Sequence, residues 1–177
     1  MPLFLVKCAS EHDVVACVEY AQSNNLALTP RCGAHNLGNF SLINGGIVVD
    51  VRPMKKISHS LENSTITYQA GCTTGDLDNY LQENAKGYTF IGTMDYTIGT
   101  PGPRLALGVG WQQRYLGNAI DNLVSMRVVL ASGIVVNTSA SENSDLFMAM
   151  KGAGSNYGVV VEFTEKIHNV LDPSQGK

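Results

Sequence analysis

The sequence predicts an α+β domain with mixed sheets rather than a regular doubly wound one. Short β-branched runs and helical patterns follow one another irregularly along 177 residues, with no internal repeat and no low-complexity linker. A chain of this length is expected to form one domain and to bury a core large enough to fold without disulfides or metals. Glycine is frequent, with 18 residues, which indicates tight turns or backbone lying close to a ligand.

The first half of the chain contains two predicted helices and three predicted strands. Ser10 to Asp13 resembles a capping box, and apolar residues recur behind it at helical spacing. Thr74 is a candidate cap for the second helix. The expected elements are a helix at 11–24, strands at 26–30, 47–51 and 64–70, a loop rich in glycine and asparagine at 31–45, and the helix after Thr74.

The second half contains a segment interrupted by glycine and proline, followed by a predicted hairpin, helix and strand. Residues 87–110 cannot form one long helix, because proline and glycine break it. Ser132-Gly133 between two apolar runs indicates a hairpin turn. The expected elements are strands at 123–131 and 134–137, a short helix at 143–150 that Gly152 closes, and a strand within 157–167.

Charge, hydropathy and motif spacing exclude several classes of protein. A net charge of −3 gives no basic surface, so nucleic acid is not an expected partner. No apolar stretch approaches the roughly 18 residues of a membrane span, and the apolar start is too short for a signal peptide, so neither is expected and the localisation stays open. The cysteines lack paired spacing, so no metal site is expected. Gly108-x-Gly110 is not a dinucleotide fingerprint, because Gln113 stands in place of its third glycine.

The most informative segment is the glycine-containing turn that follows the strand at 26–30. Consecutive backbone N–H groups in such a turn form a concave site that holds phosphate without a net positive charge, and Arg31 and His35 flank this turn. An ordinary loop with a surface histidine stays open as the alternative. The candidate binding residues are Arg31, Cys32, Gly33, Ala34, His35 and Asn36.

The order of motifs around this turn resembles that of a known family. Arg31 to His35, followed by Gly45-Gly46 and a strand ending in Asp50, is similar to the signature of FAD-linked oxidases of the berberine bridge enzyme and sugar oxidase type. Their flavin domain is the PCMH-type, or vanillyl-alcohol oxidase type, FAD-binding domain. The usual motif is Arg-Ser-Gly-Gly-His, so small residues, Cys32 and Ala34, replace Ser and the second Gly. We therefore still expect close approach of the backbone to a pyrophosphate.

The resemblance implies FAD as the cofactor and His35 as its covalent attachment. In the family, the histidine of this motif is tethered to the 8α carbon of the flavin, and the match places that residue at His35. Histidine suits this chemistry because an imidazole is largely uncharged near neutral pH and offers a free lone pair. The other histidines are interpreted as a helix-start residue, His12, and two surface residues, His59 and His168.

Residues 92–102 resemble the family's second flavin-contacting loop, whose usual form is Gly-x-Cys-Pro-x-Val-Gly-x-x-Gly. Met94 or Asp95 stands in place of the Cys that forms a second link in many members, so His35 is the only expected tether. Cys72 is not expected to substitute, because it lies in a different predicted turn, about twenty residues earlier in the chain. The candidate contacts in this loop are Gly99 and Gly102.

Two further segments resemble family patterns. Residues 105–122 keep the Arg, Gly, Asp and Asn positions of the pattern Arg-x-x-Gly-Leu-x-x-Asp-Asn, and Asp121 is a candidate contact. Leu107 replaces a glycine before that pattern, which would be unfavourable at a backbone position of positive φ. Residues 143–160 are similar to the family's closing segment, with a helix that packs on the sheet and a turn that Asn156 is expected to cap. Its candidate contacts are Asn156, Gly158 and Val160.

The resemblance covers nearly the whole chain, residues 1–167, and implies both fold and function. The fold would consist of two α+β subdomains, roughly 1–51 and 52–170, with FAD in the crevice between them. The function would be flavin-dependent oxidation of alcohols, sugars or alkaloid-like compounds, with hydride passing to flavin N5 and oxygen as acceptor. The substrate-binding domain is expected to be absent, so no catalytic base is nominated and a small-molecule substrate would bind only if that domain were supplied. The face that this domain would cover is expected to be exposed and apolar. The alternative is a non-catalytic flavin-binding or interaction module.

Overall fold

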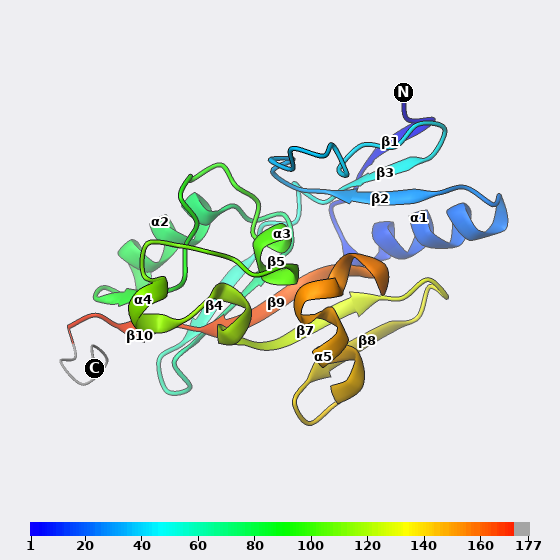
Figure 1. Ribbon diagram of the computed structural model, residues 1–177. Helices are drawn as coiled ribbons and strands as arrows, with labels where there is room; N and C mark the ends of the chain where they lie inside the picture. Colours follow the sequence, from blue (N-terminus) through cyan, green and yellow to red (C-terminus); the bar gives the residue numbers. More distant parts are fainter. Residues whose placement is uncertain (172–177) are drawn as a thin grey trace.

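The structure is a computed structural model that describes residues 1–171, and its strands form two separate main sheets (Figure 1). The smaller sheet is parallel, in the order β1-β3-β2, with strands β1 (Phe4–Lys7), β2 (Leu28–Arg31) and β3 (Ile47–Asp50). The larger sheet is antiparallel, in the order β4-β5-β9-β7-β8, with strands β4 (Ile57–Ser60), β5 (Thr65–Gln69), β7 (Leu123–Val129), β8 (Val135–Ser139) and β9 (Val159–Lys166). The expected α+β class is confirmed, but the expectation of mixed sheets is wrong, because all pairs within the smaller sheet are parallel and all pairs within the larger sheet are antiparallel.

Helix α1 (Glu11–Ser23) joins the two sheets. The expected capping box is present, since the Ser10 hydroxyl accepts from the backbone N–H of Asp13 and the Asp13 carboxylate accepts from the backbone N–H of Ser10. The buried face of α1 contacts β3 in the smaller sheet and β7 and β9 in the larger one. The parallel strands therefore share a cover helix with the antiparallel sheet.

Helix α2 (Thr74–Asn84) begins with Thr73 as its cap, so the expectation that Thr74 is the cap is wrong by one residue. The Thr73 hydroxyl accepts from the backbone N–H of Asp76, and the Asp76 carboxylate accepts from the backbone N–H of Thr73. Thr74 is already helical, and its hydroxyl pairs with that of Thr93 at 2.7 Å. The sequence offers two adjacent threonines, and only the backbone conformation distinguishes them.

The glycine- and proline-rich segment after α2 forms short elements held by one buried ion pair. Arg104 of α3 (Pro101–Leu105) donates to Glu165 of β9 at 2.8 Å and to the Ile91 carbonyl at 3.0 Å, and both charged side chains are fully buried. This pair attaches the segment to the larger sheet. The remaining short elements are β6 (Tyr88–Thr89), α4 (Gln113–Leu116), the 3-10 turn η1 (Ala119–Asn122) and β10 (His168–Asn169), which pairs with β6.

The expected hairpin and closing helix are present. Strands β7 and β8 pair antiparallel around a turn in which Gly133 has φ +80°. Helix α5 (Ser144–Ala153) loses helical backbone angles at Lys151 and Gly152, where φ is +110°, as expected for a closing glycine. The 3-10 turn η2 (Gly154–Asn156) then leads into β9.

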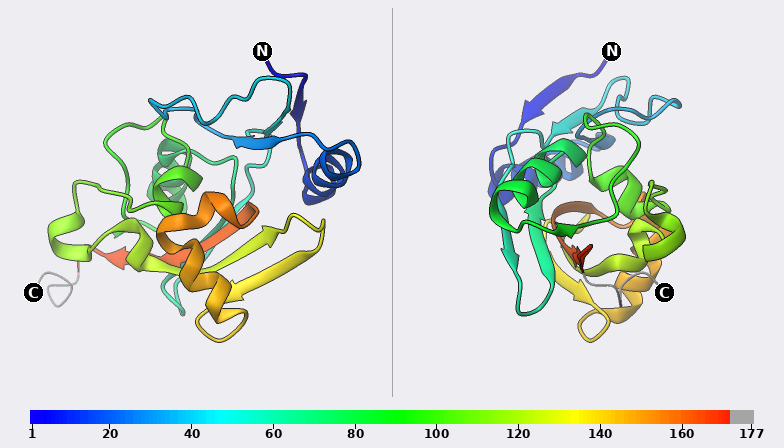
Figure 2. Two further views of the ribbon diagram at one scale, coloured as in Figure 1. Left: turned by 45° about the vertical axis from the view of Figure 1, so that its right-hand side comes forward. Right: turned by 90° about the vertical axis from the view of Figure 1, so that its left-hand side faces the viewer.

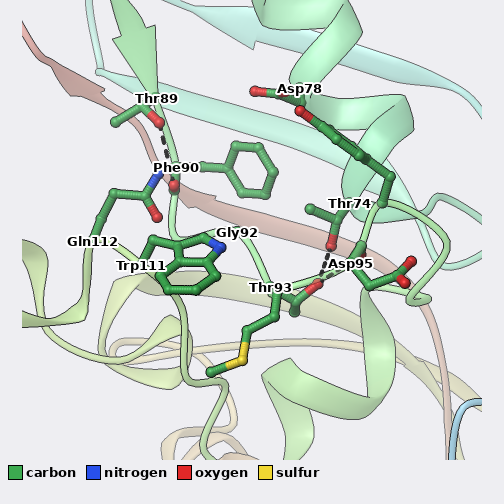
Figure 3. A pocket seen from close by; sticks show the side chains of 11 residues that line it. Thr74, Asp78, Thr89, Phe90, Gly92, Thr93, Asp95, Trp111 and Gln112 are labelled. Atoms are coloured by element: carbon green, nitrogen blue, oxygen red, sulfur yellow. Dashed lines mark hydrogen bonds between the residues drawn. The ribbon is translucent and has the colours of Figure 1, made fainter.

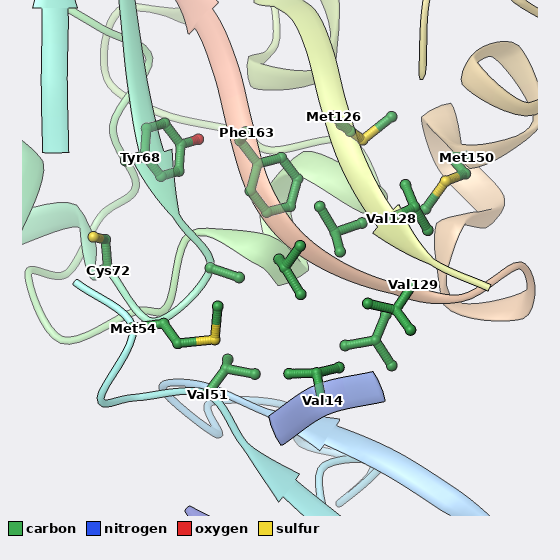
Figure 4. Packing of buried hydrophobic residues seen from close by; sticks show 14 of the residues in the cluster. Val14, Val51, Met54, Tyr68, Cys72, Met126, Val128, Val129, Met150 and Phe163 are labelled. Atoms are coloured by element: carbon green, nitrogen blue, oxygen red, sulfur yellow. The ribbon is translucent and has the colours of Figure 1, made fainter. Parts of the chain in front are cut away.

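A continuous apolar core extends through both sheets (Figure 4). Tyr68, Phe163 and Val128 on the larger sheet lie toward Val14 of α1 and Met54, which follows the smaller sheet (Figure 4). The two sheets thus occupy residues 4–50 and 57–166 in sequence but share their packing. We retain the subdomain division near residue 51 as a proposal about how the fold is organised.

Three features depart from the residue-based expectations. The sequence analysis did not predict strand β4, because Ile57–Ser60 contains a single apolar residue. The strand forms in the structure by pairing with β5. His59 is half-buried and pairs with the Tyr80 hydroxyl at 3.0 Å, and His168 is half-buried and pairs with Asn122 at 2.7 Å. The expectation that both are surface residues is therefore wrong, because neighbours distant in sequence cover them.

Candidate functional site

Two loops far apart in the sequence meet at the edge of the smaller sheet (Figures 1 and 2). A Cβ added to Gly33 would lie 2.7 Å from the carbonyl oxygen of Thr97 and closer still to the amide nitrogen of Gly99. A Cβ added to Gly99 would lie 2.5 Å from the Cys32 sulfur and from the Gly33 nitrogen. The two backbones touch, so both positions require glycine. The structure therefore brings together the predicted segments 31–36 and 92–102.

The second loop is anchored to the beginning of α2. The backbone N–H groups of Thr74 and Gly75 donate to the carbonyls of Ile98 and Tyr96 at 2.9 and 3.0 Å. Thr100 donates to the Cys72 carbonyl through both its N–H, at 3.0 Å, and its hydroxyl, at 2.9 Å. These bonds hold the loop against the same turn that contains Cys72.

The expected separation of Cys72 from this loop is therefore wrong, although its thiol is not available as a tether. Cys72 is fully buried, and burial raises the pKa of its thiol to about 12. Burial likewise raises the pKa of Cys32 to about 11, and the Cys32 sulfur lies 3.6 Å from the Cys72 carbonyl oxygen. Both thiols stay protonated near neutral pH, so neither is a reactive nucleophile.

Ala34 has a backbone conformation that favours glycine. Its φ is +58°, in the left-handed region, and its side chain is exposed. An L residue other than glycine costs about 1–2 kcal/mol in this region. The sequence analysis considered only the size of Ala34, whereas the structure shows that the turn also restricts the backbone conformation there.

His35 lies at the contact between the two loops, with an exposed side chain. Its Nε2 is 2.7 Å from the Thr97 hydroxyl oxygen, and that hydroxyl donates to Asp95 Oδ1 at 2.6 Å. The Thr97 backbone N–H donates to the same carboxylate oxygen at 2.7 Å. The hydrogen bonds from the side chain and backbone of Thr97 hold the pKa of Asp95 below its usual range, so this carboxylate is ionised near neutral pH.

Arg31 supplies a cationic group at the base of the first loop. Its Nε is buried and has no hydrogen-bond partner among residues 1–171. The neighbouring Arg52 is already engaged, because it donates to both carboxylate oxygens of Asp50. Burial alone would raise the pKa of Asp50, but these hydrogen bonds hold it below its usual range. A glycine cradle beside an unsatisfied guanidinium N–H fits an anionic group such as a pyrophosphate.

The remaining predicted site residues are engaged in local structure. Asp121 is exposed, and its carboxylate accepts from the backbone N–H of Asn118 at 3.1 Å, so it caps η1. Asn156 donates to the Ala153 carbonyl at 3.1 Å, within the turn it is expected to cap. Gly158 has φ +155°, and a Cβ there would lie 2.5 Å from the Val129 carbonyl oxygen. The Val160 side chain is buried in the core, which leaves only its backbone for a ligand.

The positive φ that would be unfavourable for Leu107 occurs at the next residue, which is a glycine. Gly108, not Leu107, has positive φ, at +70°. Leu107 is half-exposed, so its side chain lies away from the core. A Cβ on Gly154 would lie 2.9 Å from the Leu105 Cβ, which places the closing segment against α3. Gly102 has open space around it, with nothing within 4 Å of an added Cβ.

A hollow of about 150 Å³ adjoins the second loop (Figure 3). Residues 92–96 form part of its lining, whereas none of residues 31–36 does. Trp111 and Phe90 lie on one side of it, and Asp78 and Thr74 of α2 lie on the other (Figure 3). Several large apolar side chains are exposed in the segments 37–40 and 94–115, which include the two loops and α4: Leu37, Phe40, Met94, Tyr96, Leu107, Trp111 and Tyr115.

Thr97 is the site residue that the sequence analysis missed. It lies within the predicted loop at 92–102, 62 positions from His35, but the pattern of that loop does not single it out. Within residues 1–171, no group of three or more His, Cys, Asp or Glu could hold a metal ion. The same described part of the chain contains no helix of the length and apolarity that crossing a membrane requires.

Comparison with known proteins assigns this arrangement to a family. A model of the family described as "FAD binding domain" matches residues 2–139. The chain is 37% identical over 164 residues to the FAD-linked oxidoreductase pgmH of Aspergillus terreus, and this match covers 93% of the chain and 33% of pgmH. It is 35% identical over 170 residues to (R)-6-hydroxynicotine oxidase of Paenarthrobacter nicotinovorans, and this match covers 96% of the chain and 36% of the oxidase.

Solved structures agree with the sequence comparison. The chain superposes on 6-hydroxy-D-nicotine oxidase from Arthrobacter nicotinovorans with a TM-score of 0.87, at 35% identity, covering 93% of this chain and 36% of that one. It superposes on xylooligosaccharide oxidase from Myceliophthora thermophila with a TM-score of 0.90, at 32% identity, covering 93% and 35%. The chain spans about a third of the length of these relatives.

Proposed function

Since this chain belongs to the FAD binding domain family, we propose that it holds FAD for a flavin-dependent oxidoreductase. Residues 31–36 would enclose the pyrophosphate, and residues 92–102 would contact the same cofactor. The proposed reaction is oxidation of an alcohol, a sugar or an alkaloid-like compound, with oxygen as the final acceptor. This activity is proposed for the domain together with a substrate-binding part, since none of the site residues described above supplies a catalytic base.

The observation that carries this proposal is the contact between Gly33 and Gly99. Residues 66 positions apart press their backbones together, and Arg31, two residues before Gly33, has a buried Nε without a partner among residues 1–171. A guanidinium N–H buried without a partner costs about 1–3 kcal/mol. Arg104 Nη1 is a second such atom among residues 1–171, but it belongs to the buried ion pair with Glu165 and not to a loop of the site. A bound pyrophosphate would supply the acceptor that Arg31 lacks.

When bound, FAD supplies the acceptor for the hydride that leaves the substrate. The chain's own contribution is to bind and orient the cofactor. The backbone N–H groups of the turn at 33–36 and the Arg31 side chain would hold the pyrophosphate by hydrogen bonds. His35 would attach the flavin covalently, because it is exposed at the junction of the two loops and the nearby thiols of Cys32 and Cys72 stay protonated.

Replacing His35 tests the proposed attachment. After incubation with FAD, acid denaturation and mass spectrometry should show a flavin adduct on the peptide that contains His35. His35→Ala should still bind FAD but release it on denaturation, and its unfolding free energy should change by less than about 0.5 kcal/mol, because the side chain is exposed. His12→Ala, an exposed histidine on α1, is the matched control and should keep the adduct. A wild-type chain that binds no FAD would contradict the proposed function itself.

The FAD-loaded protein also distinguishes an oxidoreductase from a non-catalytic flavin-binding module. A flavin-loaded chain, combined with a substrate-binding part from a relative, should reduce its flavin when given a sugar or alkaloid-like substrate, and oxygen should restore the colour. A yellow protein that no such substrate bleaches would favour the non-catalytic flavin-binding module. A protein that stays colourless after refolding with FAD would contradict both.

A further inference from the structure

His35, Thr97 and Asp95 form a continuous hydrogen-bonded chain at the contact of the two loops. The distances are 2.7 Å from His35 Nε2 to Thr97 Oγ1 and 2.6 Å from Thr97 Oγ1 to Asp95 Oδ1. Asp95 lies two residues before Thr97, whereas His35 comes from the other loop, 62 residues away. The tertiary fold therefore delivers a hydroxyl and a carboxylate to one specific nitrogen of the imidazole.

The direction of these bonds selects one tautomer of the neutral imidazole. A hydroxyl carries one hydrogen, and the Thr97 hydroxyl donates it to the ionised Asp95, which can only accept. Thr97 Oγ1 must therefore accept from His35, so the neutral ring carries its proton on Nε2. Nδ1 then holds the free lone pair, and it has no protein partner among the described residues.

We propose that Thr97 and Asp95 are positioning residues that keep His35 in the Nε2–H tautomer and stabilise the positive charge that develops on its ring while Nδ1 forms the bond to the flavin. This inference rests on the proposed function. It assigns the ring nitrogen that stays free to form the bond, Nδ1, and the residues that hold the other nitrogen. Neither residue is expected to contact substrate.

The balance of the attachment step shows why a negative charge near the imidazole matters. A new bond forms between Nδ1 and the 8α carbon of FAD, the carbon loses one hydrogen as a proton, and the flavin gains two electrons. The alkylated imidazole would be cationic until Nε2 releases its proton to solvent, to which the exposed His35 has access, and the Asp95 carboxylate would stabilise that charge through the Thr97 hydroxyl. The two protons balance the two electrons taken up by the flavin. Molecular oxygen then accepts two electrons and two protons, becomes hydrogen peroxide, and restores the oxidised flavin.

The loop that contains the pair is held independently of His35. Thr93 donates to the Asp95 carbonyl at 3.1 Å, and its hydroxyl pairs with that of Thr74 in α2 at 2.7 Å. The carbonyls of Tyr96 and Ile98 accept from the first backbone N–H groups of α2. A partner that is already fixed restricts the imidazole at a lower entropic cost than a mobile one would.

A purely structural role for the Asp95–Thr97 contact is the competing interpretation, because the same bonds also close a local turn. The two interpretations differ in what Thr97→Val does. Valine has nearly the same shape but offers Nε2 no acceptor, whereas Thr97→Ser keeps the hydroxyl. Thr164→Val is the matched control, because Thr164 is also half of a hydroxyl pair, with Thr67 at 2.9 Å, on the larger sheet.

The first measurement needs no cofactor. In nitrogen-15 NMR of the FAD-free chain, the ring signals that disappear in His35→Ala should show a protonated Nε2 and an unprotonated Nδ1. In Thr97→Val this histidine should shift toward a mixture of tautomers, and Thr97→Ser should restore the wild-type signals. A wild-type ring that carries its proton on Nδ1 overturns the proposal.

The second measurement follows adduct formation by mass spectrometry after FAD is added at saturating concentration. Because FAD is saturating, a change in its affinity does not limit the rate, and Thr97→Val and Asp95→Asn should slow covalent attachment by at least about tenfold. Thr97→Ser and Thr164→Val should react like the wild type. Attachment at the wild-type rate in Thr97→Val overturns this inference and leaves the proposed function intact, whereas a wild-type chain that binds no FAD overturns both.

Discussion

Replacing Ala34 with glycine should stabilise the protein, although it removes a methyl group. Ala34 has φ +58°, which costs a residue with a Cβ about 1–2 kcal/mol. Glycine removes that cost but loses about 0.4–1 kcal/mol through the greater freedom of its unfolded chain. Because the Ala34 side chain is exposed, its methyl group contributes little packing. The net effect is a gain of roughly 0.5–1 kcal/mol in the free energy of unfolding.

The assay is thermal and urea denaturation of the FAD-free chain, followed by circular dichroism. A gain of 1 kcal/mol raises Tm by about 2–4 °C in a protein of this size. Asn39→Gly is the matched control in the same loop, with φ +56° and an exposed side chain. Asparagine tolerates the left-handed region, so this control should change Tm little. The reasoning is refuted if Ala34→Gly leaves Tm unchanged or lowers it, or if Asn39→Gly gives the same gain.

Three further outcomes follow from the structure. Gly33→Ala should lower the unfolding free energy by about 1–3 kcal/mol and abolish FAD binding, because its Cβ would meet the backbone of Thr97 and Gly99. Denaturation checks the first effect and flavin absorbance the second, and normal FAD binding would contradict the proposed role of the turn at 33–36. Arg104→Met should cost about 3–5 kcal/mol, since it leaves Glu165 buried without its partner, and adding Glu165→Gln should recover part of the loss, as a double-mutant cycle would show. Partial burial raises the pKa of Asp76, but its bonds to Lys55 and Thr73 outweigh that effect and lower the pKa overall. The stabilisation from these bonds is therefore present above the pKa that Asp76 has in the unfolded chain, and it is lost as the pH falls through the lower pKa of the folded protein. Unfolding measured from pH 6 down to about pH 3 should therefore show a smaller acid loss in Asp76→Asn than in the wild type, and equal losses would count against this bond.

The sequence by itself determined the local elements and the chemistry of the first loop. The Ser10 capping box, the hairpin turn at Gly133 and the helix closed by Gly152 depend on interactions within a few residues, so their patterns are visible in the chain. The order of motifs from Arg31 to Val160 was enough to indicate the family, which the comparison with known proteins confirms. Strand β4 was not predictable in the same way, because its pairing with β5 supplies what its composition lacks.

Only the tertiary structure decided how the site is assembled. The contact of Gly33 with Gly99 and the bond of His35 to Thr97 join positions more than 60 residues apart, and no local pattern encodes such a distance. The burial of the Cys72 thiol beside the same loop, and the positive φ of Ala34, likewise follow from the path that the packed backbone takes. Residue types specify what chemistry a chain can perform, whereas long-range packing specifies which groups meet, because the contacts that form the site are made between separate elements only after they have folded against a common core.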